Sequence, residues 1–519
     1  MSEIGTLDVD LTTDIKRGAL GPLYVESIGL DWRSKCKTPF RTVKRRTGAN
    51  IVLLTAFGRL FAQSPPLSSD HPWHSSDERQ IITDGRRFHP PAFRIESDRV
   101  YSLAELIDLA EGHNPETRVA WESARAQAAA LAIARSELFP TLAAVALAGV
   151  ERKEDGFGSR FYRQTLEASQ VSLNLNYTIF DFGARRGRIN AESARLLVSN
   201  FGFNNVHRQL IYAVLQAYYR LLNAAGQEEA AGASLVNAQA VQQAAEERLR
   251  NGLATLPDVL EARSATAQAQ YDLQSVLGTE EIARGDLATA LGASVTTRLR
   301  VQPLNEVPVP ESVADTVEQA ISRALEQRSD LQAQIAEIRL GQAEKQQARA
   351  AFYPSLGLSA GPSAQSLYIM QQNLPWGHTT GLTGGLAASL NWTVFDGGAR
   401  RSRLTQTEAH IREAEARVSA ARDQIEDQVW TAYSNLNTAF RQREAATSLV
   451  TAATQSYSAA LESYNAGVRN LLDVTNAQKV LAQARSTDIL ARTQVLAALA
   501  DLAFRTGDAI QPNARRTRP

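Results

Sequence analysis

"FDFGARR" occupies residues 180–186 and "FDGGARR" occupies residues 395–401, so the chain carries nearly the same seven residues twice. The match extends to both sides. "LFPTLAAVALAG" at residue 138 corresponds to "FYPSLGLSAGPS" at residue 352, an offset of 214. "RNGLATLPDVLEAR" at residue 250 corresponds to "NAGVRNLLDVTNAQ" at residue 465, an offset of 215. A nearly constant offset between residues 138 and 263 indicates that a whole structural unit has been duplicated.

The duplication divides the chain. We expect two structural repeats separated by a proline-rich linker, because prolines favour an extended connection. The predicted divisions are a leader at 1–62, an N-terminal extended segment at 63–100, a first repeat at 101–300, a linker at 301–314, a second repeat at 315–510 and a C-terminal tail at 511–519.

The leader has the layout of a secretory signal peptide. A basic run at residues 41–46 precedes the apolar stretch "ANIVLLTAFGRLFA" at residues 49–62, and a turn-rich segment follows. A short buried helix is the alternative. Elsewhere there is no run of eighteen apolar residues, so the sequence predicts no transmembrane helix.

Composition excludes several function classes. The 519 residues carry 55 basic and 55 acidic side chains, so no basic excess favours a nucleic-acid partner. The single cysteine, Cys36, can form neither an internal disulfide nor a thiolate metal site. "GLSAG" at 357–361 resembles a nucleophile elbow but falls within a predicted strand, and His71 and His74 lie in a proline-containing loop. We therefore expect no enzyme and no cofactor.

Each repeat is predicted to run helix, strand, strand, helix, helix. Ser102 and Glu105 have capping-box spacing before a helical stretch that ends by Phe139 and Pro140. Residues 184–250 contain few helix breakers, and as one helix they would reach about 100 Å. The chain then turns, and Pro257 suits the first turn of a returning helix.

The strands alternate between apolar and polar residues. Odd positions of 171–179 and even positions of 386–394 are apolar, with mostly polar residues between them. Such strands suit either a soluble sheet packed on a helix or a membrane barrel, in which Tyr177 and Trp392 would lie in an aromatic belt. Four strands cannot close a barrel, so a membrane barrel would need strands pooled from several chains.

Each copy of the opening phrase joins a strand to a helix. We expect a phenylalanine that closes the strand, an aspartate that caps the helix and a glycine that lets the backbone bend. These residues are Phe180, Asp181 and Gly183 in the first copy and Phe395, Asp396 and Gly398 in the second. The two arginines that follow either reach a headgroup layer or form a solvated first turn.

From about residue 101 to 510 the sequence resembles the TolC-type outer-membrane efflux ducts of Gram-negative bacteria. The resemblance rests on the duplicated element order, the paired Phe-Asp-x-Gly-x-Arg junctions and the turns at 252–259 and 467–474. It implies a mainly α protein with β structure: a homotrimer whose twelve-stranded outer-membrane barrel continues into a long periplasmic α-helical barrel of coiled coils. It also implies a passive exit duct for small molecules or proteins, a periplasmic adaptor (membrane fusion) protein, and an inner-membrane pump of the RND or ABC type. A soluble, coiled-coil-like helical scaffold is the alternative.

The resemblance also implies functional residues at the helix-helix turns. Gly252, Leu253 and Gly467 correspond to turns that contact the adaptor, although such glycines also serve as plain helix caps. The residues that correspond to the periplasmic gate are Asp258, Tyr464, Arg469 and Asp473. Arg469 and Asp473 also have the spacing of an ordinary ion pair on a helix.

Overall fold

The computed structural model describes residues 78–87, 95–96, 99–157, 160–310, 312, 316–371 and 376–508. The chain divides into two units, Met1–Pro90 and Pro91–Pro519. The predicted signal peptide, Cys36, both loop histidines and the tail lie outside the described residues. In the first unit the structure describes helix α2 (Glu78–Arg87), so the segment predicted to be extended contains a helix.

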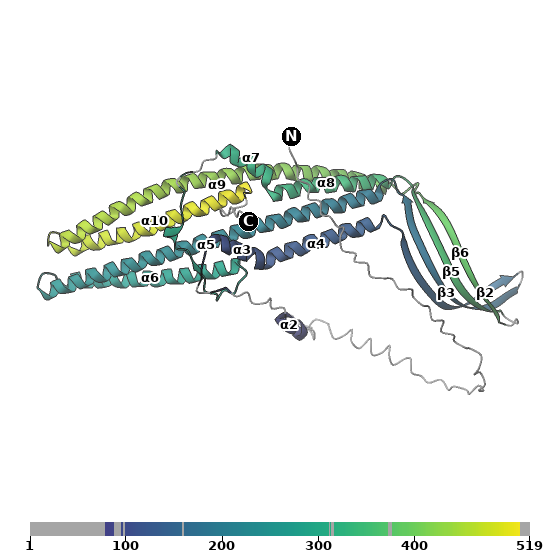
Figure 1. Ribbon diagram of the computed structural model, residues 1–519, viewed down its shortest axis with the longest axis horizontal. Coiled ribbons are helices and arrows are strands. Elements are labelled where there is room, and N and C mark those ends of the chain that lie inside the picture. The colour runs from purple at the N-terminus through teal and green to yellow at the C-terminus, as the bar shows by residue number, and fades with distance from the viewer. Residues whose placement is uncertain are drawn as a thin grey trace, which may run out of the picture. The chain divides into compact units, whose positions relative to one another are not determined.

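The second unit contains both repeats (Figure 1). The first repeat comprises α3 (Leu103–His113), α4 (Pro115–Ser136), β2 (Thr141–Phe157), β3 (Arg160–Phe180), α5 (Ala184–Arg250) and α6 (Leu256–Ala290). The second comprises α7 (Val317–Gln327), α8 (Ser329–Ala350), β5 (Ser355–Gln371), β6 (Gly377–Asn391), α9 (Ala399–Asn465) and α10 (Leu471–Thr506). Both long helices have 67 residues, as the scarcity of helix breakers predicts.

The opening helix of each repeat is divided, which corrects the prediction of one continuous helix. In the first repeat the break falls at Asn114, because Pro115 disfavours a helical conformation in the residue before it. In the second repeat Arg328 breaks the helix without a proline. Its guanidinium is buried and binds Asp330 at 2.6 Å and Gln428 of α9 at 2.9 Å. The bond to Asp330 is local, and the bond to Gln428 is a tertiary contact that holds a break without a proline.

The four long strands form one antiparallel sheet in the order β2-β3-β5-β6. Thr141 lies opposite Asn176 in the first hairpin, and Ser355 lies opposite Asn391 in the second. These two pairs differ by 214 and 215 residues, which are the offsets of the sequence repeat. The duplication therefore extends to the register of individual residues. Strands β2 and β6 are the edges of the sheet and lack a second partner among the described residues.

One face of the sheet carries exposed apolar side chains. Register places Leu142 and Leu175 on this face, and Val171 lies opposite Ala146 and Ala364. On the edge strand β6, Leu382 and Leu386 are 82% and 74% exposed. The apolar face covers about ten residues of each strand, the length that spans a bilayer at the usual tilt. The four strands therefore present one long apolar surface, and no described helix packs on it.

The end of β6 differs from the prediction. Phe180 closes β3, but β6 ends at Asn391, so Trp392 and Phe395 lie beyond the strand. Strand β3 is flanked on both sides and β6 on one side only, so the last residues of β6 have fewer backbone partners. The indole of Trp392 instead donates a hydrogen bond to the Phe352 carbonyl at 3.2 Å.

The helices pack side by side away from the sheet. Helix α5 contacts α4, α6, α8 and α10, and α9 contacts α8 and α10 (Figure 1). Each repeat has its own core, with Leu221 and Leu287 in the first and Val429 and Leu436 in the second. Strand β4 (Arg300–Val301) lies at the boundary between the first repeat and the predicted linker and pairs in parallel with β1 (Val100–Tyr101). The linker contains a short 3₁₀ helix, η1 (Leu304–Glu306). Among the described residues, no helix has both the length and the apolar character to cross a membrane.

Candidate functional site

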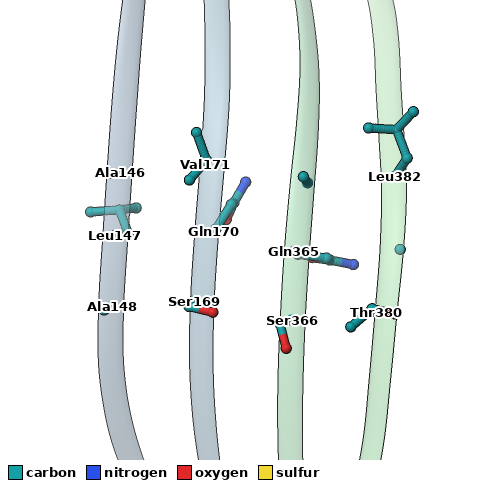
Figure 2. A pocket seen from close by; sticks show the side chains of 12 residues that line it. Ala146, Leu147, Ala148, Ser169, Gln170, Val171, Gln365, Ser366, Thr380 and Leu382 are labelled. Carbon is teal, nitrogen blue, oxygen red and sulfur yellow. The ribbon is translucent and has the colours of Figure 1, made fainter. Parts of the chain in front are cut away.

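The sheet carries a polar face opposite its apolar one. A hollow of about 700 Å³ extends across all four strands and is lined by residues of both faces. Figure 2 shows side chains that line it, among them Gln170 and Gln365 of the polar face. Gln170 and Gln365 lie opposite each other on neighbouring strands, and Gln170 donates a hydrogen bond to Ser363 at 3.2 Å. Val171, the next residue along β3, belongs to the apolar face. The alternation therefore separates a water-compatible surface from a lipid-compatible one. "GLSAG" lies within β5 and forms no strand-to-helix turn.

The two strand-helix junctions have nearly the same geometry. Asp181 accepts hydrogen bonds from the backbone of Gly183 at 3.2 Å and Arg185 at 2.9 Å, and forms an ion pair with the Arg185 guanidinium at 2.9 Å. Asp396 accepts the corresponding bonds from Gly398 at 3.1 Å and Arg400 at 3.0 Å, with an ion pair at 2.8 Å. Both glycines have positive φ, which glycine adopts most readily.

The first arginine of each junction binds three segments of the chain. Beyond its aspartate, Arg185 donates to the carbonyls of Glu137 at 3.1 Å and Ile179 at 3.4 Å. Arg400 donates to the carbonyls of Ala351 at 3.4 Å and Val394 at 3.2 Å. Each arginine thus joins the end of the preceding helix, the end of the strand segment and the start of the long helix. In the described structure these two arginines bind groups of the chain itself, so their side chains are already engaged at the junctions.

Burial opposes ionisation of Asp181, but its hydrogen bonds and the charge of Arg185 outweigh this effect and hold its pKa below the usual range. A pocket of about 520 Å³ adjoins this junction, and it is lined by Glu137, Asp181, Arg185 and Arg188 together with polar residues of the strands. The aspartate is therefore ionised at neutral pH and neutralises the arginine beside the helix N-terminus.

The two helix-helix turns share one backbone geometry. Gly252 has φ +72° and Gly467 has φ +77°. The amide of Leu253 donates to the Arg248 carbonyl at 2.8 Å, and the amide of Val468 donates to the Ser463 carbonyl at 2.9 Å. These bonds close a Schellman cap at both turns. Leu253 and Val468 are 68% and 79% exposed, so both turns present an apolar side chain to the surroundings.

The side chains of the two turns differ. Asp258 accepts hydrogen bonds from the Thr255 backbone at 2.8 Å and the Thr255 hydroxyl at 2.7 Å, which lower its pKa. Its counterpart Asp473 is capped through its own amide by Asn470 at 3.0 Å, and its carboxylate has no hydrogen bond among the described residues. Arg469 is exposed and, in the part of the chain described, makes no ion pair.

Tyr464 connects the two hairpins, but through a residue that the sequence did not single out. Arg248 stacks over the Tyr464 ring at 4.6 Å and donates to the Tyr464 carbonyl at 2.6 Å. The tyrosine hydroxyl is buried without a hydrogen bond to any described residue, and burial raises its pKa. Both tips also share one apolar cluster that includes Val259 and Leu471. The structure therefore brings Tyr464 and Asp258 to one region and places Arg248 there too, while Arg469 remains unpaired. A basic residue four positions before the first turn was the only available signal for Arg248.

Comparison with known proteins identifies the family. Residues 106–293 and 320–508 match the family described as outer membrane efflux protein. The chain is 30% identical to Protein CyaE of Bordetella pertussis over 421 residues, covering 79% of this chain and 85% of CyaE. It is 25% identical to Outer membrane protein TolC of Escherichia coli, covering 77% and 82%. The crystal structure of a membrane protein from Pseudomonas aeruginosa superposes with a TM-score of 0.69 at 23% identity, covering 81% and 100%.

The chain belongs to the outer membrane efflux protein family. This confirms the resemblance and the fold class, and it places the protein in the Gram-negative outer membrane, extending into the periplasm. The family consists of transport channels. In the described residues, no cluster of three or more His, Cys, Asp or Glu side chains could hold a metal ion.

Proposed function

We propose that the chain assembles as a homotrimer and acts as a passive exit duct, receiving cargo from an inner-membrane pump through a periplasmic adaptor. The observation that carries the proposal is the sheet with two open edges and an uncovered apolar face. Four strands are too few to close a barrel, and an exposed edge with apolar side chains is otherwise prone to aggregation. A soluble helical scaffold would leave this surface in water. Transport of this kind requires no catalytic residues.

The internal repeat supports a specific pairing between subunits. Strands β3 and β5 join the two repeats within one chain, and Val171 lies opposite Ala364. The residue of the second repeat equivalent to Val171 is Leu386 of β6, at an offset of 215. The residue of the first repeat equivalent to Ala364 is Val150 of β2, at an offset of 214. These residues lie on the two open edges and on the same apolar face. We therefore expect Leu386 to lie opposite Val150 of the partner subunit, so that twelve strands close in a trimer.

Disulfide cross-linking tests this pairing. Opposed residues of antiparallel strands have Cα atoms about 4.5 to 5.5 Å apart, within the range that a disulfide spans. In a Cys36→Ser background, Leu386→Cys with Val150→Cys should give covalent trimers on a non-reducing gel. Leu386→Cys with Gly149→Cys is the matched control, because Gly149 faces the other side of the sheet. Equal cross-linking of both pairs, or recovery of the chain as a soluble monomer, would contradict the proposal.

The helix tips are the proposed contact for the adaptor and the site of the gate. The adaptor would dock on the turns at Gly252, Leu253 and Gly467, with a pump of the RND or ABC type behind it. Support comes from the exposed apolar side chains of both turns. Asp473, present three times around the axis of a trimer, would form a ring of carboxylates that favours cations. Asp258, Tyr464 and Arg469 complete the proposed gate.

A further inference from the structure

Four exposed arginines surround the strand-helix junctions, two in each repeat at equivalent positions. Arg135 and Arg349 lie near the ends of α4 and α8 and are 214 residues apart. Arg186 and Arg401 lie in the first turns of α5 and α9 and are 215 residues apart. Within the described residues none of them forms an ion pair or a side-chain hydrogen bond. Glu408, whose pKa is lowered first by its bond to Lys345 and also by Arg349, is already paired with that lysine at 2.9 Å.

These arginines point away from the polar side of the junction. Successive helical residues are rotated by about 100°, so Arg186 points about 130° from the mean direction of Arg185 and Arg188, which line the junction pocket. Arg135 lies about 160° around α4 from Glu137, which lines the same pocket. The repeat therefore preserves two cations on the side of the junction opposite the polar pocket.

Exposed aromatic residues accompany the arginines in both repeats. Phe180 is 53% exposed and its counterpart Phe395 is 86% exposed, and Tyr353 is 56% exposed. Phe139, the counterpart of Tyr353, is 69% exposed but lines the polar pocket. A shift in strand register after Thr178 places Phe180 opposite Leu356, on the apolar face of the sheet. Aromatic residues at the end of an apolar band are typical of a membrane-water interface. The arginines therefore lie where the apolar surface ends.

We propose that Arg135, Arg186, Arg349 and Arg401 bind the phosphates of anionic phospholipids in the periplasmic leaflet and so set the depth of the protein in the membrane. The inference rests on the membrane orientation in the proposed function. Cations in a first helical turn oppose the helix dipole, and Arg186 and Arg401 lack the aspartate partner that Arg185 and Arg400 have. A guanidinium fits a phosphate through two parallel hydrogen bonds. Continuity with the apolar face selects a lipid over a dissolved anion.

Lipid retention by the purified trimer tests this assignment. The wild-type trimer is placed in nanodiscs of phosphatidylcholine that contain about 30% phosphatidylglycerol, so that both lipids can reach the protein. The phosphatidylglycerol that remains bound per trimer is then counted by native mass spectrometry. Arg186→Gln with Arg401→Gln should lower the preference for phosphatidylglycerol by roughly five-fold for each arginine removed, the factor that corresponds to about 1 kcal/mol per basic residue at an anionic surface.

A charge-matched variant provides the control. Arg118→Gln with Arg298→Gln removes two exposed arginines that make no ion pair in the described structure and lie away from the sheet. This variant should keep the wild-type preference, and Arg186→Lys with Arg401→Lys should keep most of it. Equal lipid preference in the glutamine variant and the wild type, or an equal loss in the control, would overturn the inference. A wild-type chain that forms no trimer in nanodiscs would instead contradict the proposed function.

Discussion

The two repeats agree more closely at the sheet end of the second unit than at the helix tips. At the sheet end, Asp181 and Asp396 make the same three bonds at distances that agree within 0.1 Å. At the helix tips the turns share their backbone bonds, but Thr255 holds Asp258 while the carboxylate of Asp473 has no such partner. At both strand-to-helix transitions an aspartate must accept the first backbone hydrogen bonds of the long helix and pair with the arginine. The tips have kept the shared turn and diverged in their side chains, so the two hairpins can serve different roles.

The largest expected effect concerns the apolar face, where both repeats should respond alike. Leu173→Arg or Leu386→Arg should each destabilise the protein by about 2 to 4 kcal/mol, because both residues lie within the apolar band and a cation at mid-bilayer depth loses its hydration. Asn174→Arg, on the polar face, should be mild. Urea unfolding in lipid vesicles measures both. Equal tolerance on the two faces would remove the distinction on which the membrane assignment rests.

The junction aspartates should also be equivalent. Asp181→Ala should cost about 1 to 3 kcal/mol, because it removes a helix cap and leaves a partly buried arginine without its carboxylate. Asp396→Ala removes the same bonds and should destabilise the second junction in the same direction. Since ionisation of Asp181 is favoured in the folded state, its contribution is present above the pKa of about 3.9 for a free aspartate and declines as pH falls through the lower folded value. The thermal midpoint of the trimer between pH 2 and 7 measures this. A large difference between the two variants would show that the junctions are not equivalent.

The glycines of the turns test whether the tips share a function as well as a backbone. Gly252→Glu and Gly467→Glu place a side chain at positive φ, a strain of about 1 to 2 kcal/mol, on the proposed adaptor surface. Export should be lost while the trimer yield is unchanged. Gly232→Glu, in open space within α5, is the control. Loss of the trimer itself would indicate that these glycines act only as helix caps.

The contact between the tips should depend on Arg248 of the first hairpin and not on the equivalent residue of the second, Ser463. Arg248→Ala combined with Arg469→Ser should raise conductance in planar bilayers several-fold, an effect of about 1 kcal/mol, because Arg248 links the first hairpin to Tyr464. Ser463→Ala, at the position equivalent to Arg248, should leave conductance unchanged. Tyr464→Phe should have little effect, since the hydroxyl it removes has no hydrogen bond. Wild-type conductance in the arginine double variant would exclude Arg248 and Arg469 from the gate.

The smallest effect distinguishes the two aspartates of the tips. Asp473→Ala should weaken the cation preference of the channel, because its carboxylate is not engaged by a neighbour in the described structure. Asp258→Ala should change selectivity less, since Thr255 binds that carboxylate. Reversal potentials under a salt gradient measure the difference. Equal shifts in both variants would mean that the hydrogen bonds of Asp258 do not shield its charge.

Local sequence signals determined much of this architecture. The offsets of 214 and 215 predicted the duplication, and the strand register follows them residue by residue. The scarcity of helix breakers predicted α5, which spans Ala184–Arg250, and alternation predicted the two faces of the sheet. These features depend on residues close together in the chain, because helical and strand periodicities are local. The site roles at the turns came from family resemblance and remain predictions.

Only the tertiary structure decided the features that depend on distant partners. Arg328 breaks a helix because it is buried against Gln428, 100 residues away. Arg248 donates a hydrogen bond to the Tyr464 carbonyl, 216 residues later in the chain. Arg185 donates to the Glu137 carbonyl at the end of α4, 48 residues earlier. Strand β6 ends before Trp392 because an edge strand has a neighbour on one side only. Periodicity within a segment shows which face is apolar, but it does not show which distant carbonyl, carboxylate or strand will lie against that segment.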